Sequence, residues 1–417
     1  MKIKKIVFLF ILMGCATKYQ KEDLVCIQIN DRNGFNETVS SKERLKKYEK
    51  VNFISSQPYK KVIRIFKENK FGKRISKITS YYENGIINQY LEGVNGRAFG
   101  KYKQWYPNGI LAVEANIVGG SFELSFFSQK DWIFDGMCKA WDDKGNLISE
   151  FKYDKGELEG KAIYYFSNGK IKKILNYLKN NIEGEVLEFK KEGDLKQKSF
   201  YSKGKKEGVA KGFWKKDKLA FFEIYQEGDL LKGIYYDKNG EIISKVVDKK
   251  GEKAIFSDKG LDRLVEYKEG QPEGRVKIFK KGKLYKIFYM KEGKKHGEEI
   301  EYYLQKETPK ISIPWIEGVI QGVVKTWYPN FIIQSQKEMA QNKKNGISSA
   351  WYEDGHLMLA ERYENDFLIE GKYYKKGENE PITEVYDGNG TATLFDEKGN
   401  FVKSIKYINR IPQDESF

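Results

Sequence analysis

A unit of 24 residues recurs along this chain, and this repeat constrains the fold more strongly than any other feature of the sequence. Three copies follow one another from residue 151 to residue 222, and in single letters they read FKYDKGELEGKAIYYFSNGKIKKI, LNYLKNNIEGEVLEFKKEGDLKQK and SFYSKGKKEGVAKGFWKKDKLAFF. Their third-position tyrosines, Tyr153, Tyr177 and Tyr201, are 24 residues apart. A period of roughly 20 to 50 residues is typical of a stacked array, because each unit is too small to bury its apolar face alone.

Within the unit, a glycine is followed by four residues and then by an aromatic residue. Asn-Gly pairs, which supply the positive φ angles of tight hairpin turns, recur between these stretches. Aromatic and β-branched residues, which favour strands, fill the stretches themselves, and the frequent glycines would break a long helix. The repeat therefore predicts two short strands per unit. This prediction rests most on Gly136 with Trp141, Gly160 with Tyr165, Gly184 with Phe189, Gly322 with Trp327, and Gly346 with Trp351.

The predicted fold is all-β, an elongated, solenoid-like array of about 13 or 14 β-hairpin repeats. The pattern divides the chain into a signal peptide (1–15), a tether and lead-in segment (16–75), the repeat array (76–410) and a short tail (411–417). Inside the array, the copy near residues 248–260 is shortened and has lost its leading aromatic residue. We expect this departure to change the course of the array locally.

The repeat also resembles a known family. The pattern Tyr-x-x-Gly-x-x-x-Gly-x-x-x-x-aromatic-aromatic-x-x-Gly, from about Tyr81 to Tyr407, is similar to the bacterial variant of the MORN repeat (membrane occupation and recognition nexus). The resemblance implies a row of β-hairpins that contacts proteins or membrane surfaces, and some bacterial relatives carry an antitoxin-like label. Repeat arrays are scaffolds with many uses, so the resemblance indicates the fold more directly than the function.

The N-terminus has the features of an export signal. Three lysines among residues 2–5 precede an apolar stretch at 6–13, which is too short to cross a bilayer as a mature helix. The Leu-Met-Gly-Cys sequence at 12–15 resembles a lipobox, which implies cleavage before Cys15 and lipidation of its sulfur. We therefore predict a lipoprotein of the bacterial cell envelope, in the outer membrane if the cell has two membranes. A plain secretory signal is the alternative.

One copy of the repeat is enlarged between residues 119 and 136 by about twelve residues, a common way to build a binding feature on a repeat scaffold. Alternatively, the extra residues fold back as a hairpin that covers the sheet. The aromatic residues of this candidate binding insertion are Phe122, Phe126, Phe127, Trp132 and Phe134.

Charge suggests a partner class without naming one. The chain has 75 lysines and arginines against 59 acidic residues, a formal net charge of +16, and its lysines crowd turns and strand edges. Lysine protects exposed strand edges and adds solubility. A basic array also suits an anionic membrane surface or an acidic protein partner. The export signal disfavours nucleic acid as a partner.

No catalytic or cofactor-binding pattern stands out. The two histidines lie sixty residues apart, at His296 and His356, and no His-Cys spacing typical of a zinc site is present. A phosphate-binding loop is also lacking, so we predict no enzymatic activity, no metal and no cofactor. Cys138 lies where other copies carry alanine or valine and is interpreted as a packing residue, and a disulfide between Cys26 and Cys138 stays open.

The sequence is most consistent with a non-catalytic, membrane-anchored repeat scaffold that binds a protein partner or an anionic membrane surface. A cell-wall glycan-binding protein is an alternative, because aromatic hairpin repeats also occur in choline-binding and glucan-binding modules. Those modules usually have a shorter period and more regular tryptophan cages than this chain, which has seven tryptophans. An antitoxin or immunity protein is the other alternative, suggested only by the family label.

Overall fold

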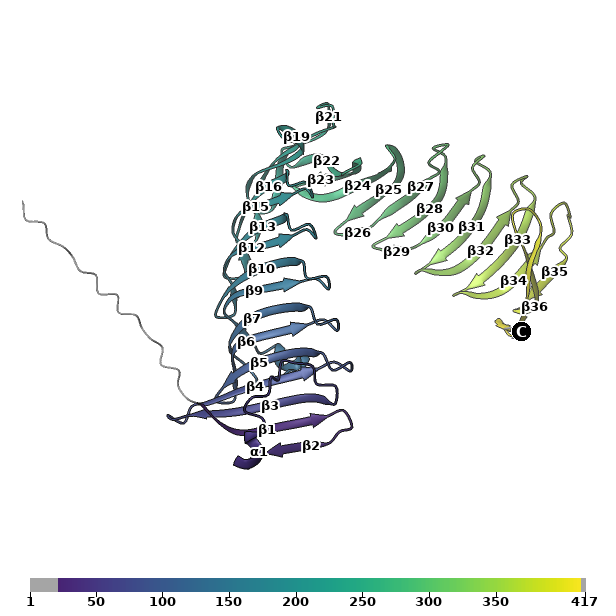
Figure 1. Cartoon of the computed structure of the whole chain (residues 1–417). Coiled ribbons are helices and arrows are strands. Elements are labelled where there is room, and N and C mark those ends of the chain that lie inside the picture. The colour runs from purple at the N-terminus through teal and green to yellow at the C-terminus, as the bar shows by residue number, and fades with distance from the viewer. Residues whose placement is uncertain (1–21, 414–417) are drawn as a thin grey trace, which may run out of the picture. The chain divides into compact units, whose positions relative to one another are not determined.

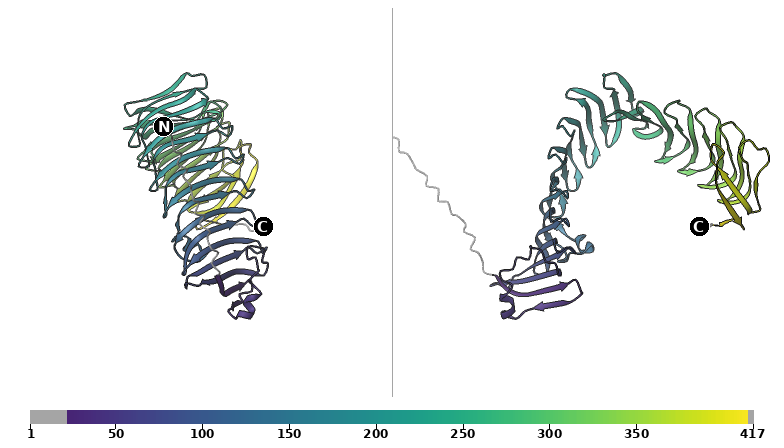
Figure 2. Two further views of the ribbon diagram at one scale, coloured as in Figure 1. Left: turned by 60° about the vertical axis from the view of Figure 1, so that its left-hand side comes forward. Right: turned by 45° about the vertical axis from the view of Figure 1, so that its right-hand side comes forward.

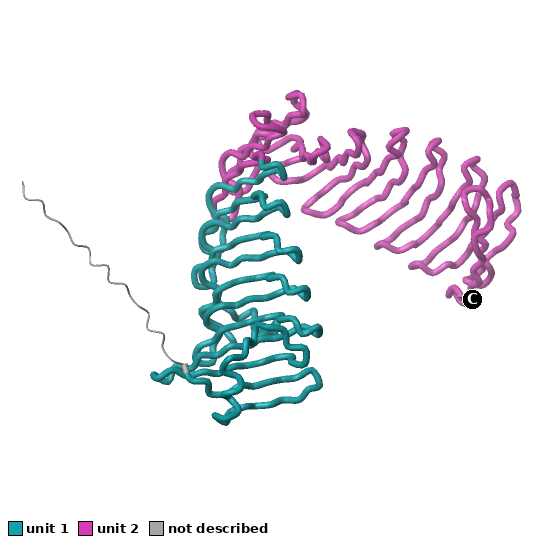
Figure 3. Tube along the Cα trace, viewed as in Figure 1, with its two compact units in different colours: residues 1–193 teal, residues 194–417 magenta. Residues whose placement is uncertain are grey.

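The computed structural model describes residues 22–413, and this part of the chain is all-β, with 38 strands and two short helices, α1 (Lys42–Lys46) and α2 (Phe126–Gln129) (Figure 1). The strands pair antiparallel with their neighbours in the chain, which confirms the predicted hairpin architecture. Cys15 and the predicted signal peptide lie outside the described residues. The chain divides into two compact units, residues 1–193 and 194–417 (Figure 3), and in each unit successive strands lie side by side (Figure 2).

The glycine–aromatic spacing corresponds to one strand of each hairpin. Several strands begin at the glycine and end at the aromatic residue, as Gly160–Tyr165 (β12) and Gly184–Phe189 (β15) do. Both of these glycines have a φ of 80°, in the left-handed region that favours glycine, and an added Cβ at Gly160 would have one heavy atom within 4 Å, the Cδ of Lys152 at 3.7 Å. At Gly184 no such contact exists at all, so backbone conformation alone requires the glycine there.

The first unit is an open antiparallel sheet that starts near the N-terminus of the described residues. Residues 16–75, expected as a tether and lead-in segment, include folded strands, so the hairpin array begins before residue 76. The strands of this unit are β1 (Glu22–Asp31), β2 (Asn36–Val39), β3 (Lys60–Asn69), β4 (Arg74–Tyr81), β5 (Ile87–Val94), β6 (Arg97–Trp105), β7 (Leu111–Gly119), β8 (Ile133–Phe134), β9 (Gly136–Trp141), β10 (Leu147–Asp154), β11 (Glu157–Leu158), β12, β13 (Ile171–Leu178), β14 (Asn181–Ile182) and β15.

A small core closes the N-terminal end of this unit. Ile27 and Ile29 of β1 pack with Val39 of β2, Ile63 of β3 and Leu45 of α1, and all five side chains are buried. The helix thus covers apolar side chains that the first strands would otherwise expose. Burying them stabilises the first hairpins, which have repeat neighbours on only one side.

The second unit continues the hairpin pattern. Residues 411–413, expected in the tail, form a strand that pairs with β37. The strands of this unit are β16 (Leu195–Ser202), β17 (Lys205–Lys206), β18 (Gly208–Lys215), β19 (Lys218–Gln226), β20 (Asp229–Tyr236), β21 (Ile242–Val247), β22 (Lys250–Ser257), β23 (Gly260–Lys268), β24 (Gln271–Lys280), β25 (Lys283–Lys291), β26 (Lys294–Lys295), β27 (Gly297–Tyr302), β28 (Pro309–Ile316), β29 (Val319–Ile320), β30 (Gly322–Trp327), β31 (Ile333–Ala340), β32 (Lys343–Trp351), β33 (Leu357–Glu364), β34 (Phe367–Tyr373), β35 (Thr383–Tyr386), β36 (Asn389–Phe395), β37 (Phe401–Ile408) and β38 (Ile411–Gln413).

Side-chain hydrogen bonds join the turns of successive repeats. The Tyr106 hydroxyl donates to the carbonyl oxygen of Trp141 at 2.9 Å, and the amide nitrogen of the Asn108 side chain donates to the carbonyl oxygen of Asp143 at 2.8 Å. The tyrosine is the second residue of the aromatic pair, and it binds the carbonyl of the first aromatic residue in the next copy. The same bond recurs from Tyr82 to Trp105, from Tyr303 to Trp327 and from Tyr328 to Trp351.

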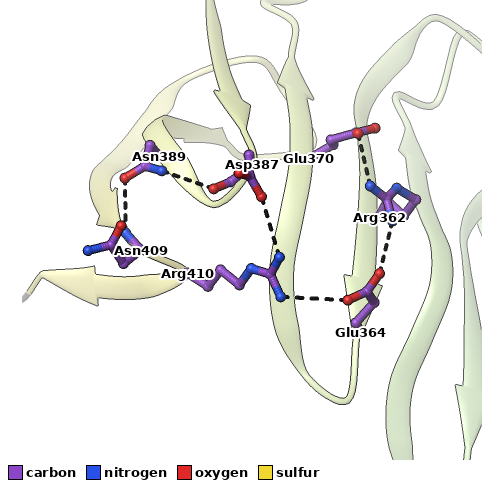
Figure 4. Close-up of polar contacts among 7 residues, drawn as sticks. All are labelled: Arg362, Glu364, Glu370, Asp387, Asn389, Asn409 and Arg410. Atoms are coloured by element: carbon purple, nitrogen blue, oxygen red, sulfur yellow. Dashed lines mark hydrogen bonds and ion pairs between the residues drawn. The ribbon is translucent and has the colours of Figure 1, made fainter.

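Ion pairs join the hairpins at the C-terminal end of the second unit (Figure 4). The Arg410 guanidinium lies 3.4 Å from Asp387 and 3.6 Å from Glu364. Arg362 pairs with the same Glu364 at 3.3 Å and with Glu370 at 2.9 Å. Exposed ion pairs each contribute little, about 0–1 kcal/mol, but this network links three successive turns.

Candidate interaction site

The insertion at residues 119–136 is a compact loop, and its two ends lie close together at the sheet. At Gly120, φ is +112°, and an added Cβ would lie 2.5 Å from the carbonyl oxygen of Asp131. The two ends of the loop therefore touch through their backbones, which only glycine permits at this position. Strand β8 then pairs with β7, with Phe134 opposite Ile117.

Three of the five predicted aromatic residues anchor the loop to the first unit. The ring of Trp132 lies 4.8 Å from the ring of Tyr102, and its indole N–H donates to the carbonyl oxygen of Ser121 at 2.8 Å. Phe122 packs so closely over the sheet that a Cβ at Gly93 would lie 2.3 Å from its ring. Phe134 lies 5.4 Å from the ring of Tyr153. These three side chains fold the insertion back onto the sheet, as one of the two interpretations of the sequence predicted.

The other two aromatic residues point away from the sheet. Phe126 and Phe127 lie on α2 and are 69% and 78% exposed, with their ring centroids 6.0 Å apart. The ammonium nitrogen of Lys130 lies 5.0 Å from the first ring and 5.8 Å from the second. We call Phe126, Phe127 and Lys130 the aromatic knuckle.

The knuckle is held in place by its flanking residues. The Ser125 hydroxyl accepts a hydrogen bond from the backbone N–H of Ser128 at 3.1 Å, which caps the start of α2. Glu123 pairs with Arg64 of β3 at 2.8 Å. Lys130 and the Ser125 cap were not singled out from the sequence. Ser125, placed directly before Phe126 and Phe127, was the available signal for the cap.

The side chains beneath the loop are mainly apolar, and the ionisable groups among them are held in their neutral forms. Burial raises the pKa of the Tyr102 hydroxyl to about 12 and also raises the pKa of the Cys138 thiol. Cys138 packs against the apolar cluster beneath the loop, and both Cys138 and Cys26 are free thiols. Among residues 22–413, no group of three histidines, cysteines or acidic residues is placed to hold a metal ion. The described site is therefore suited to binding through apolar and cationic contacts.

Many of the lysines that crowd the sequence contact acidic or aromatic side chains of the sheet. Lys173 pairs with Glu188 at 2.9 Å, and Lys139 pairs with Glu150 at 2.7 Å. Lys344 lies 4.2 Å from the centre of the Tyr363 ring. These lysines contact side chains of the sheet itself. The sequence therefore contains more lysines than are available to an external partner.

The described chain thus defines a hairpin-repeat protein with an inserted loop that presents two neighbouring exposed phenylalanines. Two segments, residues 100–118 and 158–179, match the family described as "MORN repeat variant". A search of curated proteins found no similar sequence. Among solved structures, a porin-like protein from Bacteroides uniformis is 10% identical, with 61% of this chain and 95% of that chain covered and a TM-score of 0.16. Within the described residues, neither helix is long and apolar enough to cross a membrane.

Proposed function

We propose that this chain is a non-catalytic scaffold of the bacterial cell envelope, anchored through a lipidated Cys15, whose aromatic knuckle docks on an anionic membrane surface. The observation that carries the proposal is the pair of exposed phenylalanines beside Lys130 on a loop whose base is fixed. Aromatic side chains enter the interfacial region of a bilayer, and a neighbouring lysine is attracted by anionic headgroups.

The expected affinity of the knuckle alone is modest. Burying a phenylalanine side chain contributes about 1.5–3 kcal/mol, and a lysine near an anionic surface contributes about 1 kcal/mol. Together the knuckle supplies about 4–7 kcal/mol, a dissociation constant of roughly 10 μM to 1 mM. Such a contact is too weak to hold a protein on a membrane alone, but it orients a protein that a lipid already anchors.

Cys15 is close in the sequence to the unit that carries the knuckle. Cys15 precedes the first described residue, Glu22, by seven positions, a length that spans at most about 25 Å. The insertion contacts early strands of the sheet, through Glu123 with Arg64 of β3 and through Phe122 with Gly93 of β5. This placement supports simultaneous engagement of the lipid and the knuckle.

Vesicle flotation tests the proposal. The chain from residue 16 onward, made without lipid, is mixed with phosphatidylcholine vesicles and with vesicles that also contain phosphatidylglycerol, at low and high salt. We expect binding to the anionic vesicles only, weakened by salt and reduced about tenfold or more by Phe126→Ser with Phe127→Ser. The matched control is Phe367→Ser, at a 54% exposed phenylalanine of the second unit, which should leave binding unchanged. Absence of vesicle binding, or equal binding by the double variant, contradicts membrane docking and points to a protein partner.

A further inference from the structure

Two segments of the second unit contain the same buried cluster. In each, a glutamate and a tyrosine two residues later lie on one strand, and a glycine and a tyrosine lie on the next strand of the hairpin. The two segments are offset by 138 residues, and their members are Glu223, Tyr225, Gly233 and Tyr235 in the first and Glu361, Tyr363, Gly371 and Tyr373 in the second.

In the first segment, a carboxylate is buried with two phenols and an ammonium. Glu223 is 1% exposed, and its two oxygens accept hydrogen bonds from the hydroxyls of Tyr235 at 2.8 Å and Tyr225 at 2.9 Å. The Lys253 ammonium lies 2.7 Å from Glu223 and donates to the Tyr225 hydroxyl at 2.7 Å. A buried carboxylate needs such a partner, because an unpaired charge in the interior is costly.

In the second segment, the carboxylate and both phenols are arranged in the same way. Glu361 accepts hydrogen bonds from the hydroxyls of Tyr373 at 3.0 Å and Tyr363 at 3.1 Å. An added Cβ at Gly371 would lie 2.6 Å from the Tyr373 hydroxyl, as one at Gly233 would lie 2.5 Å from that of Tyr235. The glycine therefore lets the tyrosine ring lie across the strand in both segments.

The strand that supplies Lys253 also has a counterpart. Gly251 of β22 lies opposite Tyr267, and Gly390 of β36 lies opposite Tyr407. A Cβ at either glycine would lie 2.2 Å from a backbone carbonyl oxygen of the preceding strand, so the two strands take the same path. Lys253 comes two residues after the first glycine, and the residue two positions after the second is Ala392.

The second segment therefore has the carboxylate without the lysine that neutralises it in the first. Among the described residues, Glu361 has no ion-pair partner, and it is half-buried where Glu223 is fully buried. Lys344 lies over the Tyr363 ring at 4.2 Å, but Lys206 lies in the same way over Tyr225 at 4.7 Å. Lys344 is thus common to both clusters: the charge of Glu361 favours its ammonium form, which raises the Lys344 pKa against the larger lowering effect of burial, but no ion pair joins the two side chains in the described part of the chain.

We propose that Glu361, Tyr363, Tyr373 and Tyr407 form a binding site for an alkylammonium group carried by an external ligand. The ligand's ammonium takes the place at Glu361 that the Lys253 ammonium takes at Glu223. The carboxylate supplies the charge, the Tyr363 hydroxyl accepts a hydrogen bond, and the tyrosine rings attract the cation through their faces. Both a lysine side chain of a protein and a free amine carry this group. The site lies in the second unit and is independent of the aromatic knuckle.

Calorimetric titration of the full chain with n-butylammonium chloride tests the site, with n-butanol as the neutral probe of the same shape. We expect one ammonium bound per chain, no binding of butanol, and a loss of about tenfold or more in Glu361→Gln. The exposed Glu378→Gln variant serves as the matched control and should bind like the unchanged chain. Equal uptake of butylammonium and butanol, or unchanged binding by Glu361→Gln, overturns the proposal.

Two variants test the comparison between the clusters: one removes the lysine from the first cluster, and the other adds a lysine to the second. Lys253→Ala should create a second butylammonium site at Glu223, so that the stoichiometry rises to two and the probe restores part of the lost thermal stability. Ala392→Lys should supply Glu361 with an internal ammonium and abolish the probe's binding. If Lys253→Ala folds and binds no additional probe, the comparison between the two clusters is wrong. Titration with putrescine and with the peptide Gly-Gly-Lys-Gly-Gly then distinguishes a free amine from a protein lysine as the preferred source.

Discussion

The indole of Trp132 packs against the ring of Tyr102, with centroids 4.8 Å apart, and this contact determines which aromatic residues of the insertion face solvent. Tyr102 lies on β6, whereas Trp132 comes from the far end of the inserted loop. Because Trp132 is buried and its indole N–H is bonded to the loop's own backbone, the loop cannot turn its other aromatic residues inward without losing this contact. Phe126 and Phe127 are left outside as a consequence.

Trp132→Ala should therefore release the loop and destabilise the first unit. Replacing a buried tryptophan by alanine costs about 3–5 kcal/mol through lost burial and the cavity that remains. We expect a lower unfolding midpoint in denaturant and faster proteolysis within residues 119–136. Phe127→Ala, at an exposed position of the same loop, is the control and should change stability by less than about 0.5 kcal/mol. A stable, protease-resistant Trp132→Ala variant would contradict the anchoring role of the indole.

Cys15→Ser should release the chain from the membrane fraction, because it removes the predicted site of lipid attachment. Two or more acyl chains anchor a protein far more firmly than electrostatic contacts do, so the unchanged protein should resist extraction by high salt. The measurement is fractionation of cells followed by salt washing. A Cys15→Ser variant that stays in the membrane fraction after the wash would rule out the lipid anchor.

Glu299 should make stability depend on pH. Its carboxylate is buried, and burial alone would raise its pKa, but hydrogen bonds from Lys286 and Lys295 outweigh burial and lower the pKa below its ordinary value of 4.5. A carboxylate whose pKa is lower in the folded state stabilises the fold above the unfolded-state value, and this contribution is lost as pH falls through the folded-state value.

Comparing thermal unfolding of the unchanged chain and Glu299→Gln from pH 7 to pH 3 measures this contribution. Glu299→Gln should unfold at a lower temperature at pH 7, and the difference should shrink as pH falls below 4.5. A difference that stays constant over this range would show that the carboxylate charge does not stabilise the fold.

Gly184 and Gly212 should respond to alanine for different reasons. Gly184 has a φ of +80° and no atom within 4 Å of an added Cβ, so alanine there costs about 1–2 kcal/mol in backbone strain. Asparagine tolerates this conformation better, so Gly184→Asn should recover part of the loss. At Gly212, an added Cβ would lie 2.1 Å from the Phe221 ring, and Gly212→Ala should be rescued by Phe221→Leu instead. Denaturant unfolding of the four variants checks both expectations.

Tyr328→Phe should remove one bond between successive turns without changing the packing of the ring. The Tyr328 hydroxyl donates to the carbonyl oxygen of Trp351 at 2.9 Å, and a hydrogen bond of this kind contributes about 0.5–1.5 kcal/mol. Tyr303→Phe, which removes the equivalent bond to Trp327, should cost a similar amount. Hydrogen exchange at the backbone of the turns that follow would show whether the loss is local, as expected for a repeat array.

The hairpin pattern was predictable because residues close together in the sequence determine it. A glycine that must adopt positive φ and an aromatic residue five positions later mark the ends of a strand, and the structure has strands from Gly136 to Trp141 and from Gly322 to Trp327. The sequence of a single repeat did not predict that the second residue of the aromatic pair hydrogen-bonds to the next repeat. The Tyr106 hydroxyl reaches the carbonyl oxygen of Trp141 only because the next hairpin stacks beside it.

The sequence alone thus determined that the chain is an array of short β-hairpins, since turn residues and alternating aromatic positions act within a few residues of one another. It also located the inserted loop at residues 119–136. Only the tertiary structure decided that Trp132 anchors the insertion while Phe127 faces solvent, and that Lys253 neutralises Glu223 while Glu361 lacks such a partner. These outcomes depend on which strand each side chain meets across the sheet, and residues far apart in the sequence set that environment.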